Sequence, residues 1–505
     1  MAYLATQLWT IILFGLANCR ELDEKRLHHY LMENKKYHKS VMPPKRENAV
    51  RLTVNLGLRL SQLLDMDEKN QIMTTSVWLH QEWYDPRLEW DPKEYGDLKL
   101  TYIPSNDLWK PDIVLYNNAD GDFHVKLLTK AKVEHNGRIT WEPPVIYKSY
   151  CPIDIEFFPF DIQECFLKFG LWTYDGSLID LQHVCSDKAV YINETDEEVI
   201  DRGIDIKDVY PNAEWDIINV TARRREKFYT CCKNVFYIDI TFNITLRRRI
   251  LFYSLNLIMP CVSISGLAVL VFYLPSDSGE KITLSISVLL ALSVFFLLLS
   301  DIMPPTSLVI PMIGKYLLFT MSVVTLSIFL TVYTLGINFR RPSTGSMPVW
   351  IKVVFTELLP RILLMERPAL DSLDINEPNN MNSCNNCNGI DQGDLHPLPN
   401  VVVSSDIIRD STRGPQVTCK KQYSQTVLVA FQEVKYIAKK LEEDEKKITI
   451  IRDWKFIAMV MDRLFLFIFT TACICGTVSL LIQAPSLYDV RPALSNNAPL
   501  DSCSF

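Results

Sequence analysis

Four long stretches of the chain carry no charged residue, and they constrain its fold more than any other feature. Their positions are residues 250–276, 282–300, 316–339 and 464–484. About 20 apolar residues suffice for a helix to cross a bilayer, and four such runs make buried core helices the weaker explanation. We therefore predict a four-helix transmembrane bundle. The predicted spans are residues 250–274, 281–301, 313–338 and 458–483.

The segments between the spans indicate the membrane topology. Residues 1–19 are apolar and precede a charged run, as in a secretory signal peptide; a buried N-terminal helix is the alternative. A cleaved signal places residues 20–249 outside, and four spans return the tail, residues 484–505, to the outside. Residues 339–457 are then cytoplasmic. Basic residues near both ends of that segment agree with this, because cytoplasmic loops are enriched in Lys and Arg.

The outside segment has the pattern of strands. Apolar and polar residues alternate along 50–56 and 237–245, as in half-buried strands, and clusters of Asn, Asp and Gly mark turns. Residues 21–34 have the pattern of a helix. We predict an extracellular immunoglobulin-like β-sandwich with an N-terminal helix.

Secretion permits disulfides in the outside segment. Cys151 and Cys165 bracket thirteen residues, a reasonable loop for a disulfide to close. The bond before Pro159 in this loop is a candidate for a cis peptide. N-x-T sequons predict glycosylation at Asn193, Asn219 and Asn243.

The cytoplasmic segment reads as partly helical and partly disordered. Residues 349–365 are amphipathic, residues 371–418 are rich in Asn, Asp, Ser and Pro, and residues 427–454 are helical and lead toward the fourth span. Cys384 and Cys387 form a C-x2-C pair, but no second pair at zinc spacing accompanies it. We expect no metal site and no cofactor.

The second span carries a polar stripe. The residues within an arc of roughly 80° on a helix are Thr283, Ser287, Leu290, Val294, Leu297 and Asp301. Glu280 adds a carboxylate at the inner end. Copies of this helix around an axis would line a cation path, because carboxylate rings concentrate cations and an apolar constriction closes by dewetting. The plain alternative is that the hydroxyls bond to their own helix backbone.

With these features, the sequence resembles a nicotinic acetylcholine receptor subunit of the α type, with invertebrate features. The resemblance covers residues from about 22 through the third span, and again about 425–484. The motifs that carry it are FPFD from Phe158, WKPDIVLYNNADGDF from Trp109, WTYDG from Trp172, YTCC from Tyr229, FYLPSDSGEKITLSISVLLALSVFF from Phe272 and MDRLFLFIF from Met461.

The resemblance implies an agonist site. Its principal face would contain Tyr116, Trp172, Tyr229 and Tyr237, beneath a loop closed by a Cys231–Cys232 disulfide. The chemistry agrees, because a quaternary ammonium has no hydrogen-bond donor and is held best by aromatic faces. Core packing is the commoner fate of any single ring.

The complementary face of such a site comes from a neighbouring subunit. Trp78 matches the family's aromatic residue there, whereas Lys132, Thr140 and Glu142 occupy positions that are often apolar in good complementary faces. Whether this chain serves both faces, and so forms homomers, is left open. A heteromeric pentamer is the first expectation.

The resemblance also implies residues that couple agonist binding to the pore. Glu68 and Arg248 match an ion pair between the two domains, near which the Cys loop would meet the turn around Pro304. The trio expected to rearrange when the loop closes is Lys168, Asp239 and Tyr229. The plain alternative is a set of surface pairs worth under about 1 kcal/mol.

Two cysteines depart from the family pattern. Cys185 is an extra cysteine without a family partner, and Cys503 near the end of the chain is either free or pairs between subunits. The sequon common near the second Cys-loop cysteine is absent, with Glu164 in its place.

Together these features predict a subunit of a pentameric, acetylcholine-gated cation channel in the plasma membrane, at postsynaptic sites. Its expected partners are acetylcholine and nicotinic agonists, other receptor subunits, membrane lipids, and permeant Na⁺ and K⁺, with Ca²⁺ left open. The alternative is a non-cholinergic or anion-selective member of the same Cys-loop channel superfamily. Glu280 before Lys281 argues against an anion channel, where Pro-Ala is usual, and four spans argue against a non-channel binding protein. No nucleophile, zinc-protease or phosphate-loop motif supports an enzyme, and no basic stripe supports nucleic-acid binding.

Overall fold

The structure is a computed structural model of the chain. It describes residues 23–46, 49–192, 197–229, 235–306, 308–340, 348–365, 401–403, 421–423, 425–484 and 488–494. These residues fall into two compact units. The first is drawn from Met1–Ser265, Leu290–Met321 and Ile474–Phe505, and the second from Gly266–Leu289 and Ser322–Cys473.

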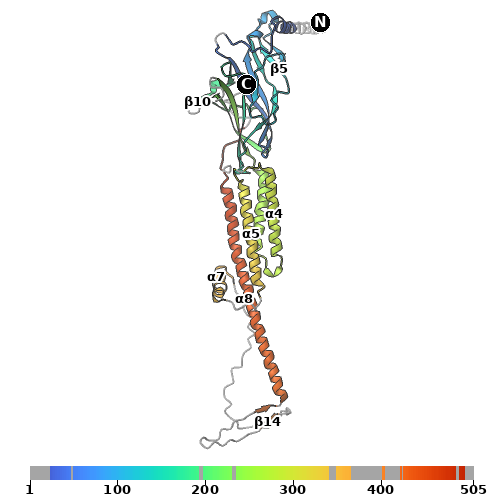
Figure 1. Cartoon of the computed structure of the whole chain (residues 1–505), viewed down its shortest axis with the longest axis vertical. Coiled ribbons are helices and arrows are strands. Elements are labelled where there is room, and N and C mark those ends of the chain that lie inside the picture. The colour runs from blue at the N-terminus through green and yellow to red at the C-terminus, as the bar shows by residue number, and fades with distance from the viewer. Residues whose placement is uncertain are drawn as a thin grey trace, which may run out of the picture. The chain divides into compact units, whose positions relative to one another are not determined.

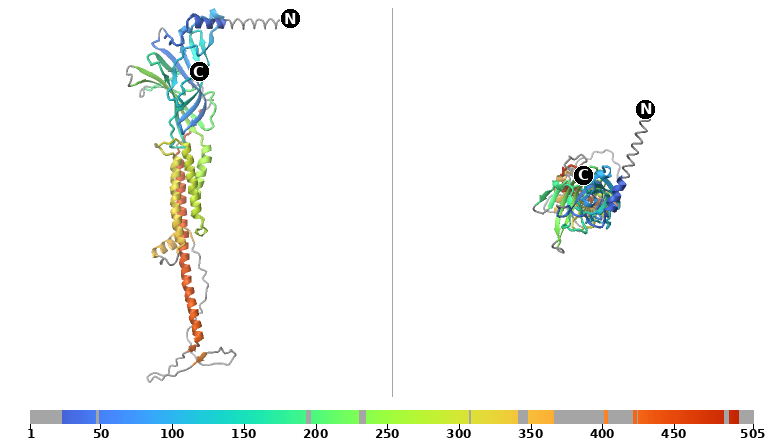
Figure 2. Two further views of the ribbon diagram at one scale, coloured as in Figure 1. Left: turned by 45° about the vertical axis from the view of Figure 1, so that its right-hand side comes forward. Right: turned by 90° about the horizontal axis from the view of Figure 1, so that it is seen from above.

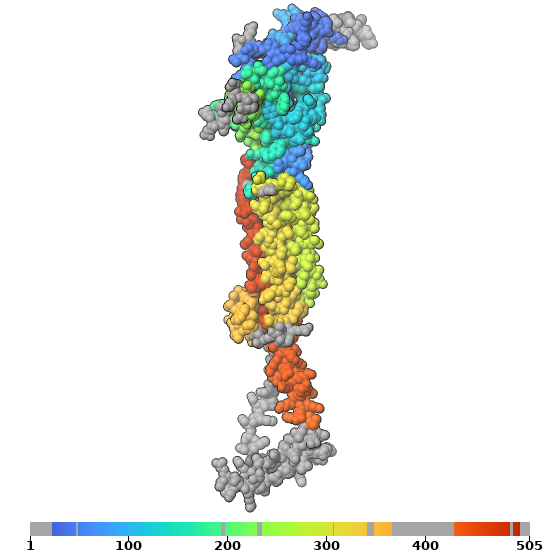
Figure 3. Space-filling view, viewed as in Figure 1, coloured from blue at the N-terminus to red at the C-terminus, as the bar shows by residue number. Residues whose placement is uncertain are grey.

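The first unit contains the predicted β-sandwich, whose strands are seen in Figures 1 and 2. One sheet, of seven described strands, has the order β3-β5-β6-β2-β1-β9, with β7 also paired to β2. Its strands are β1 (Leu52–Asp67), β2 (Ile72–Tyr84), β3 (Leu100–Pro104), β5 (Lys130–Glu134), β6 (Arg138–Trp141), β7 (Pro144–Tyr150) and β9 (Ile179–His183). In the space-filling view its blue-to-cyan residues lie together on one side of the sandwich (Figure 3).

The other sheet, of six described strands, has the order β10-β11-β12-β13-β8-β4. Its strands are β4 (Ile113–Leu115), β8 (Ile162–Leu171), β10 (Val190–Ile192), β11 (Glu197–Asp201), β12 (Trp215–Phe228) and β13 (Phe236–Arg248). Among the described residues, four short 3₁₀ turns lie outside the strands: η2 (Pro86–Leu88), η3 (Pro92–Tyr95), η4 (Ser186–Lys188) and, near the inner end of the second span, η6 (Ser276–Ser278).

The alternating patterns explain where β1 and β13 lie. Leu52, Val54 and Leu56 are buried in the core between the sheets, because successive side chains of a strand point to opposite faces. The predicted start was too early, since Val50 lies outside the strand and is 82% exposed. The N-terminal helix is confirmed: residues 23–29 are helical and continue into η1 (Tyr30–Asn34).

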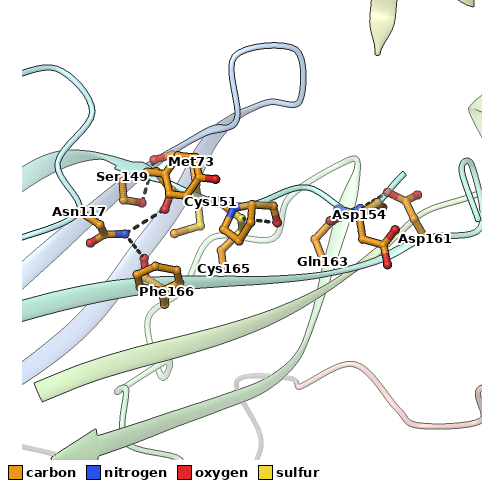
Figure 4. The surroundings of a disulfide bond; sticks show 11 residues. Met73, Asn117, Ser149, Cys151, Asp154, Asp161, Gln163, Cys165 and Phe166 are labelled. Carbon is orange, nitrogen blue, oxygen red and sulfur yellow. Dashed lines mark hydrogen bonds between the residues drawn. A yellow bond between two sulfur atoms is a disulfide. The ribbon is translucent and has the colours of Figure 1, made fainter. Parts of the chain in front are cut away.

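A disulfide joins the two sheets, as predicted (Figure 4). Cys151, directly after β7, bonds to Cys165 on β8, with 4.9 Å between their Cα atoms. The Asn117 amide donates to the carbonyls of Tyr150 and Phe166, one next to each cysteine. The bond before Pro159 is cis. The start of the loop is therefore held to both sheets.

Within the described residues, four helices are long and apolar enough to cross a membrane, by length and composition. The first comprises α2 (Leu251–Tyr253), η5 (Ser254–Ile258) and α3 (Met259–Leu270). The others are α4 (Lys281–Ile302), α5 (Met312–Asn338) and α8 (Gln425–Ile482). The predicted helix of residues 427–454 does run into the fourth span, because α8 is one continuous helix. The amphipathic segment forms α6 (Val349–Val353), η8 (Val354–Leu358) and α7 (Leu359–Ile362).

In the second unit, polar contacts tie α8 to the other helices. Lys281 at the start of α4 is buried and lies 2.6 Å from the Asp462 carboxylate on α8. Asp277 accepts hydrogen bonds from Asn338 and Lys455. Charges at these helix ends are thereby paired within the subunit.

Several expectations fall outside the described residues. They are the signal peptide at 1–19, the Cys231–Cys232 bond, the Asn193 sequon, Cys384, Cys387, Cys503 and most of 371–418. Within the last range, β14 (Val401–Val403) pairs with β15 (Lys421–Tyr423), so these three residues are not disordered as expected.

Candidate functional site

The four predicted agonist-site rings form two pairs in the second sheet. Tyr116 follows β4 and Trp172 follows β8, and their ring centroids are 6.4 Å apart. Tyr229 follows β12 and lies 5.8 Å from Tyr237 on the neighbouring β13. Because β4, β8, β13 and β12 are neighbours in the sheet, the two pairs sit on adjacent strands. The structure brings the predicted aromatics together.

The position of Tyr116 is set by its neighbours. A Cβ added to Gly170 would lie 2.5 Å from the Tyr116 ring, so only glycine fits there. Burial, followed by the nearby Tyr229 and acidic groups, raises the pKa of Tyr116 to about 12. Its hydroxyl therefore stays protonated at neutral pH, and it donates to the Leu171 carbonyl at 2.6 Å.

Trp172 is held by its backbone while its ring remains open to solvent. Its N–H donates to the carbonyl of Asp112, whose carboxylate also accepts from the Thr173 N–H. The side chain is 68% exposed. A large aromatic ring on a fixed backbone, exposed in one subunit, is suited to contact a ligand or a neighbouring subunit.

Lys168 and Asp239, two members of the predicted trio, form an ion pair of 3.1 Å. The Asp239 side chain is 4% exposed, and the Lys168 ammonium also lies 5.9 Å from the Tyr116 ring centroid. Among the described residues, no hydrogen bond joins Tyr229 to this pair; the Lys227 ammonium lies over its ring instead. The third member of the trio, Tyr229, instead contacts Lys227 and Tyr237.

The predicted complementary face centres on β2. Trp78 is 44% exposed. Two residues farther along the same face, His80 contacts the carboxylates of Glu142 and Glu82. Burial lowers the pKa of His80, but its interactions with the carboxylates of Glu142 and Glu82 outweigh this effect, so the pKa is raised. The ion pair of His80 and Glu142 thus lies on the same face as Trp78. This face is polar, as the presence of Glu142 led us to expect.

Arg248 is the centre of the predicted coupling site. Its guanidinium lies 2.8 Å from Glu68 and 3.3 Å from Glu214, and its side chain is fully buried. It also makes a two-pronged pair with Asp161, through Nε at 2.8 Å and Nη2 at 3.0 Å. The ring of Trp215 lies 4.2 Å from the guanidinium carbon. Burial opposes the charge, but these carboxylates raise the pKa of Arg248.

Sequence reasoning missed Asp161, which binds Arg248 more fully than Glu68 does. The signal was present, because Asp161 is the last residue of the FPFD motif. A charge-swapped Glu68/Arg248 pair would place a new carboxylate next to Asp161 and Glu214. We therefore do not expect a charge swap between Glu68 and Arg248 to restore the pairing.

The Cys loop and the turn between α4 and α5 meet as expected. A cavity of about 420 Å³ is lined by Ile155 from the loop and by Pro304 from the turn. The Met312 N–H at the start of α5 donates to the Glu156 carbonyl at 2.8 Å. Lys69, next to Glu68, lies 3.9 Å from Asp301 at the end of α4.

The α4 stripe is open in the single subunit. All six of its predicted residues and Glu280 are exposed. Leu290 is 66% exposed and Leu297 is 67% exposed. The Ser287 hydroxyl donates to the Thr283 carbonyl, which is the plain alternative considered above. That hydrogen bond leaves the stripe exposed. Ser287 therefore bonds to its own helix backbone and still lies on the predicted pore-lining stripe.

The two described sequons differ in access. Asn219 is exposed, whereas Asn243 is partly buried and its amide faces the Thr221 hydroxyl at 3.5 Å. Glycosylation stays a prediction at both.

Comparison with known proteins agrees with this architecture. The ligand binding domain of neurotransmitter-gated ion channels matches residues 24–250, and their transmembrane region matches residues 257–481. Acetylcholine receptor subunit alpha-type unc-63 of Caenorhabditis elegans is 49% identical, over 94% of this chain and 95% of its own length.

Two further relatives have similar coverage. Acetylcholine receptor subunit alpha-like of Manduca sexta is 45% identical over 97% of this chain and 94% of its own length. Neuronal acetylcholine receptor subunit alpha-6 of Mus musculus is 41% identical over 93% of both chains. The chain therefore belongs to the neurotransmitter-gated ion-channel family.

Proposed function

We propose that this chain is a subunit of a pentameric acetylcholine-gated cation channel, in which it supplies the principal agonist face and one pore-lining helix. The observation that carries the proposal is the aromatic cluster of Tyr116, Trp172, Tyr229 and Tyr237. Such rings bind a quaternary ammonium through cation–π attraction, worth about 2 kcal/mol or more when desolvated. Cys231 and Cys232 would close the loop above them.

The inner end of α4 supports cation selectivity. Glu280 is exposed, whereas the adjacent Lys281 is buried against Asp462. The exposed charges at the two ends of the stripe are therefore the carboxylates of Glu280 and Asp301. Rings of these carboxylates would concentrate cations such as Na⁺ and K⁺. Leu290 is proposed as the hydrophobic gate.

Agonist binding would act through the Lys168–Asp239 pair and the Arg248 site. A ligand shifts the channel toward the open state only by its different affinity for the two states. The proposed topology is a signal peptide at 1–19, an extracellular domain at 20–249, a cytoplasmic loop at 339–457 and an extracellular tail at 484–505. The exposed apolar residues of α5 would contact lipid, among them Leu326, Phe329 and Val332.

The experiment is expression of this chain in oocytes, alone and with other receptor subunits, with acetylcholine-evoked current recorded while sodium and chloride are replaced in turn. A reversal potential that follows sodium is expected. A reversal that follows chloride overturns the cation assignment. Current from the chain expressed alone indicates a homomer, in which Trp78 supplies the complementary face of the agonist site. Current only with partner subunits indicates an obligate heteromer, and the absence of both current and labelled-antagonist binding in every combination overturns the proposal.

A further inference from the structure

A cavity of about 280 Å³ lies within the second unit, beside the turn that leads from α3 to α4. Residues Phe272–Asp277 of that turn form one wall. The rest of the lining comes from the end of α5 and from α8: Asn338, Lys455, Met459, Asp462 and Arg463. In the proposed topology the turn and the end of α5 both face the cytoplasm. The cavity therefore lies where the inner leaflet of the membrane meets the cytoplasm.

The charges around this cavity do not balance. The Asp277 carboxylate accepts from the Lys455 ammonium at 3.1 Å, and the Asp462 carboxylate lies 2.6 Å from the Lys281 ammonium. Each carboxylate is therefore neutralised by one lysine. Arg463 is the third cation of the group, and it forms no ion pair with any residue that the structure describes. One positive charge remains without an acidic partner there.

Arg463 is exposed at the edge of the cavity. Its guanidinium carbon lies 5.4 Å from the ring centroid of Tyr273, which is 65% exposed. Arg463 is also the last charged residue before the charge-free run 464–484. Arginine and tyrosine side chains at such a boundary lie at the level of the lipid headgroups. The unpaired charge is thus placed where an anionic headgroup can reach it.

The donors at the cavity match a phosphate group. A guanidinium presents a planar fork of N–H donors that fits two phosphate oxygens. The Lys455 ammonium, which donates to Asp277, lies in the same lining and adds positive charge. Basic pockets at the cytoplasmic side of membrane spans bind anionic headgroups. Phe467, one helical turn beyond Arg463 on α8, is 57% exposed, so an acyl chain would lie along an apolar part of that helix.

We propose that this cavity binds the phosphate group of an anionic phospholipid of the inner leaflet, with Arg463 as the main contact and Lys455 as the second. The inference rests on the proposed topology. The headgroup supplies the negative charge that the cavity lacks, and it joins α8 to the turn before α4. A soluble phosphate ion has the same oxygen chemistry, so the test must separate these two sources.

The test uses the purified full-length receptor in detergent, titrated with phosphatidylglycerol or with phosphatidylcholine of the same acyl chains. Native mass spectrometry measures the bound lipid. The wild type should prefer phosphatidylglycerol, and Arg463→Gln should weaken that binding by about tenfold, because it removes hydrogen bonds to a charged group. Lys455→Gln, the second variant, should weaken it less. Arg452→Gln is the matched control, because Arg452 is an exposed arginine of α8 outside the cavity lining, and it should leave the affinity unchanged.

Equal affinity of the wild type for the two lipids overturns the proposal. So does a phosphatidylglycerol affinity that Arg463→Gln leaves unchanged; if that variant does not fold, as judged by its elution profile, an unchanged affinity in Lys455→Gln decides in its place. Displacement of the lipid by an equal concentration of inorganic phosphate indicates a soluble-anion site and overturns the lipid assignment.

Acetylcholine-evoked current separates this result from the proposed function. A protein that binds phosphatidylglycerol through Arg463 but conducts in no subunit combination retains the lipid site and loses the proposed function. A conducting channel without lipid preference retains the function and loses only the lipid site.

Discussion

Arg248 and Asp161 form a buried, two-pronged ion pair at the base of the sandwich. The Nε–Oδ1 and Nη2–Oδ2 distances are 2.8 and 3.0 Å, and the side chains are 0% and 3% exposed. Asp161 belongs to the Cys loop, and Arg248 is the last residue of β13, directly before the first span. This pair, more than Glu68, joins the loop to the strand that leads into the membrane.

We expect Asp161→Asn to prevent assembly at the surface. Removing one partner of a buried pair costs about 3–5 kcal/mol, because the other charge is left without compensation. Surface binding of labelled antagonist measures the effect. Glu214→Gln is the control, since Glu214 contacts the same guanidinium at 3.3 Å but is 47% exposed; its loss should cost under about 1 kcal/mol. Equal antagonist binding in the two variants would contradict the central role of Asp161.

Trp172→Ala should raise the half-maximal acetylcholine concentration by about 30-fold. That factor corresponds to the loss of about 2 kcal/mol of cation–π attraction. Concentration–response curves give the value. Trp350→Ala is the matched control, because Trp350 is 65% exposed and lies on α6. A Trp172→Ala curve that overlies the wild type would remove this ring from the agonist site.

Leu290→Ser should lower the half-maximal acetylcholine concentration, by about tenfold. A polar residue at an apolar constriction weakens dewetting and so destabilises the closed pore, and tenfold corresponds to about 1.4 kcal/mol. Leu326→Ser makes the same change at an exposed leucine of α5. It should leave the half-maximal acetylcholine concentration unchanged. An unchanged or raised value for Leu290→Ser would exclude this residue as the gate.

The His80 cluster should make the receptor more stable at pH 6 than at pH 8.5. The pKa of His80 is raised, so its contribution is complete below the ordinary value of 6.5 and is lost as pH rises through the raised pKa. The pKa of Glu142 is lowered and that of Glu82 falls to about 2. The contributions of these two carboxylates to stability are present above pH 4.5, their ordinary pKa, and are lost at lower pH.

Thermal unfolding of the purified full-length protein, followed by tryptophan fluorescence, measures this dependence. His80→Gln should remove most of the difference in Tm between pH 6 and pH 8.5. His124→Gln replaces an exposed histidine and should preserve it. A His80→Gln protein with the wild-type pH dependence would show that the cluster does not contribute.

Sequence pattern alone was enough for the spans, the strands and the α4 stripe. Each is a local regularity: charge-free length for a membrane helix, period two for β1 and β13, and a 100° turn per residue for the stripe. The Cys151–Cys165 bond was also readable, because a short loop separates the two cysteines. The agonist-site rings came from motif resemblance, and their roles remain predictions.

The resemblance led us to expect the Glu68–Arg248 and Lys168–Asp239 pairs, but only the tertiary structure revealed two further buried charge pairs. Asp161 and Arg248 are 87 residues apart in the chain, and Lys281 and Asp462 are 181 apart. No periodicity encodes such pairs, because they depend on how strands and helices pack after they form. The same holds for the tail, whose contact with Ile217 places it on the extracellular domain. Local pattern specifies each element from its own residues, whereas long-range partners are chosen by the packing of all the elements together.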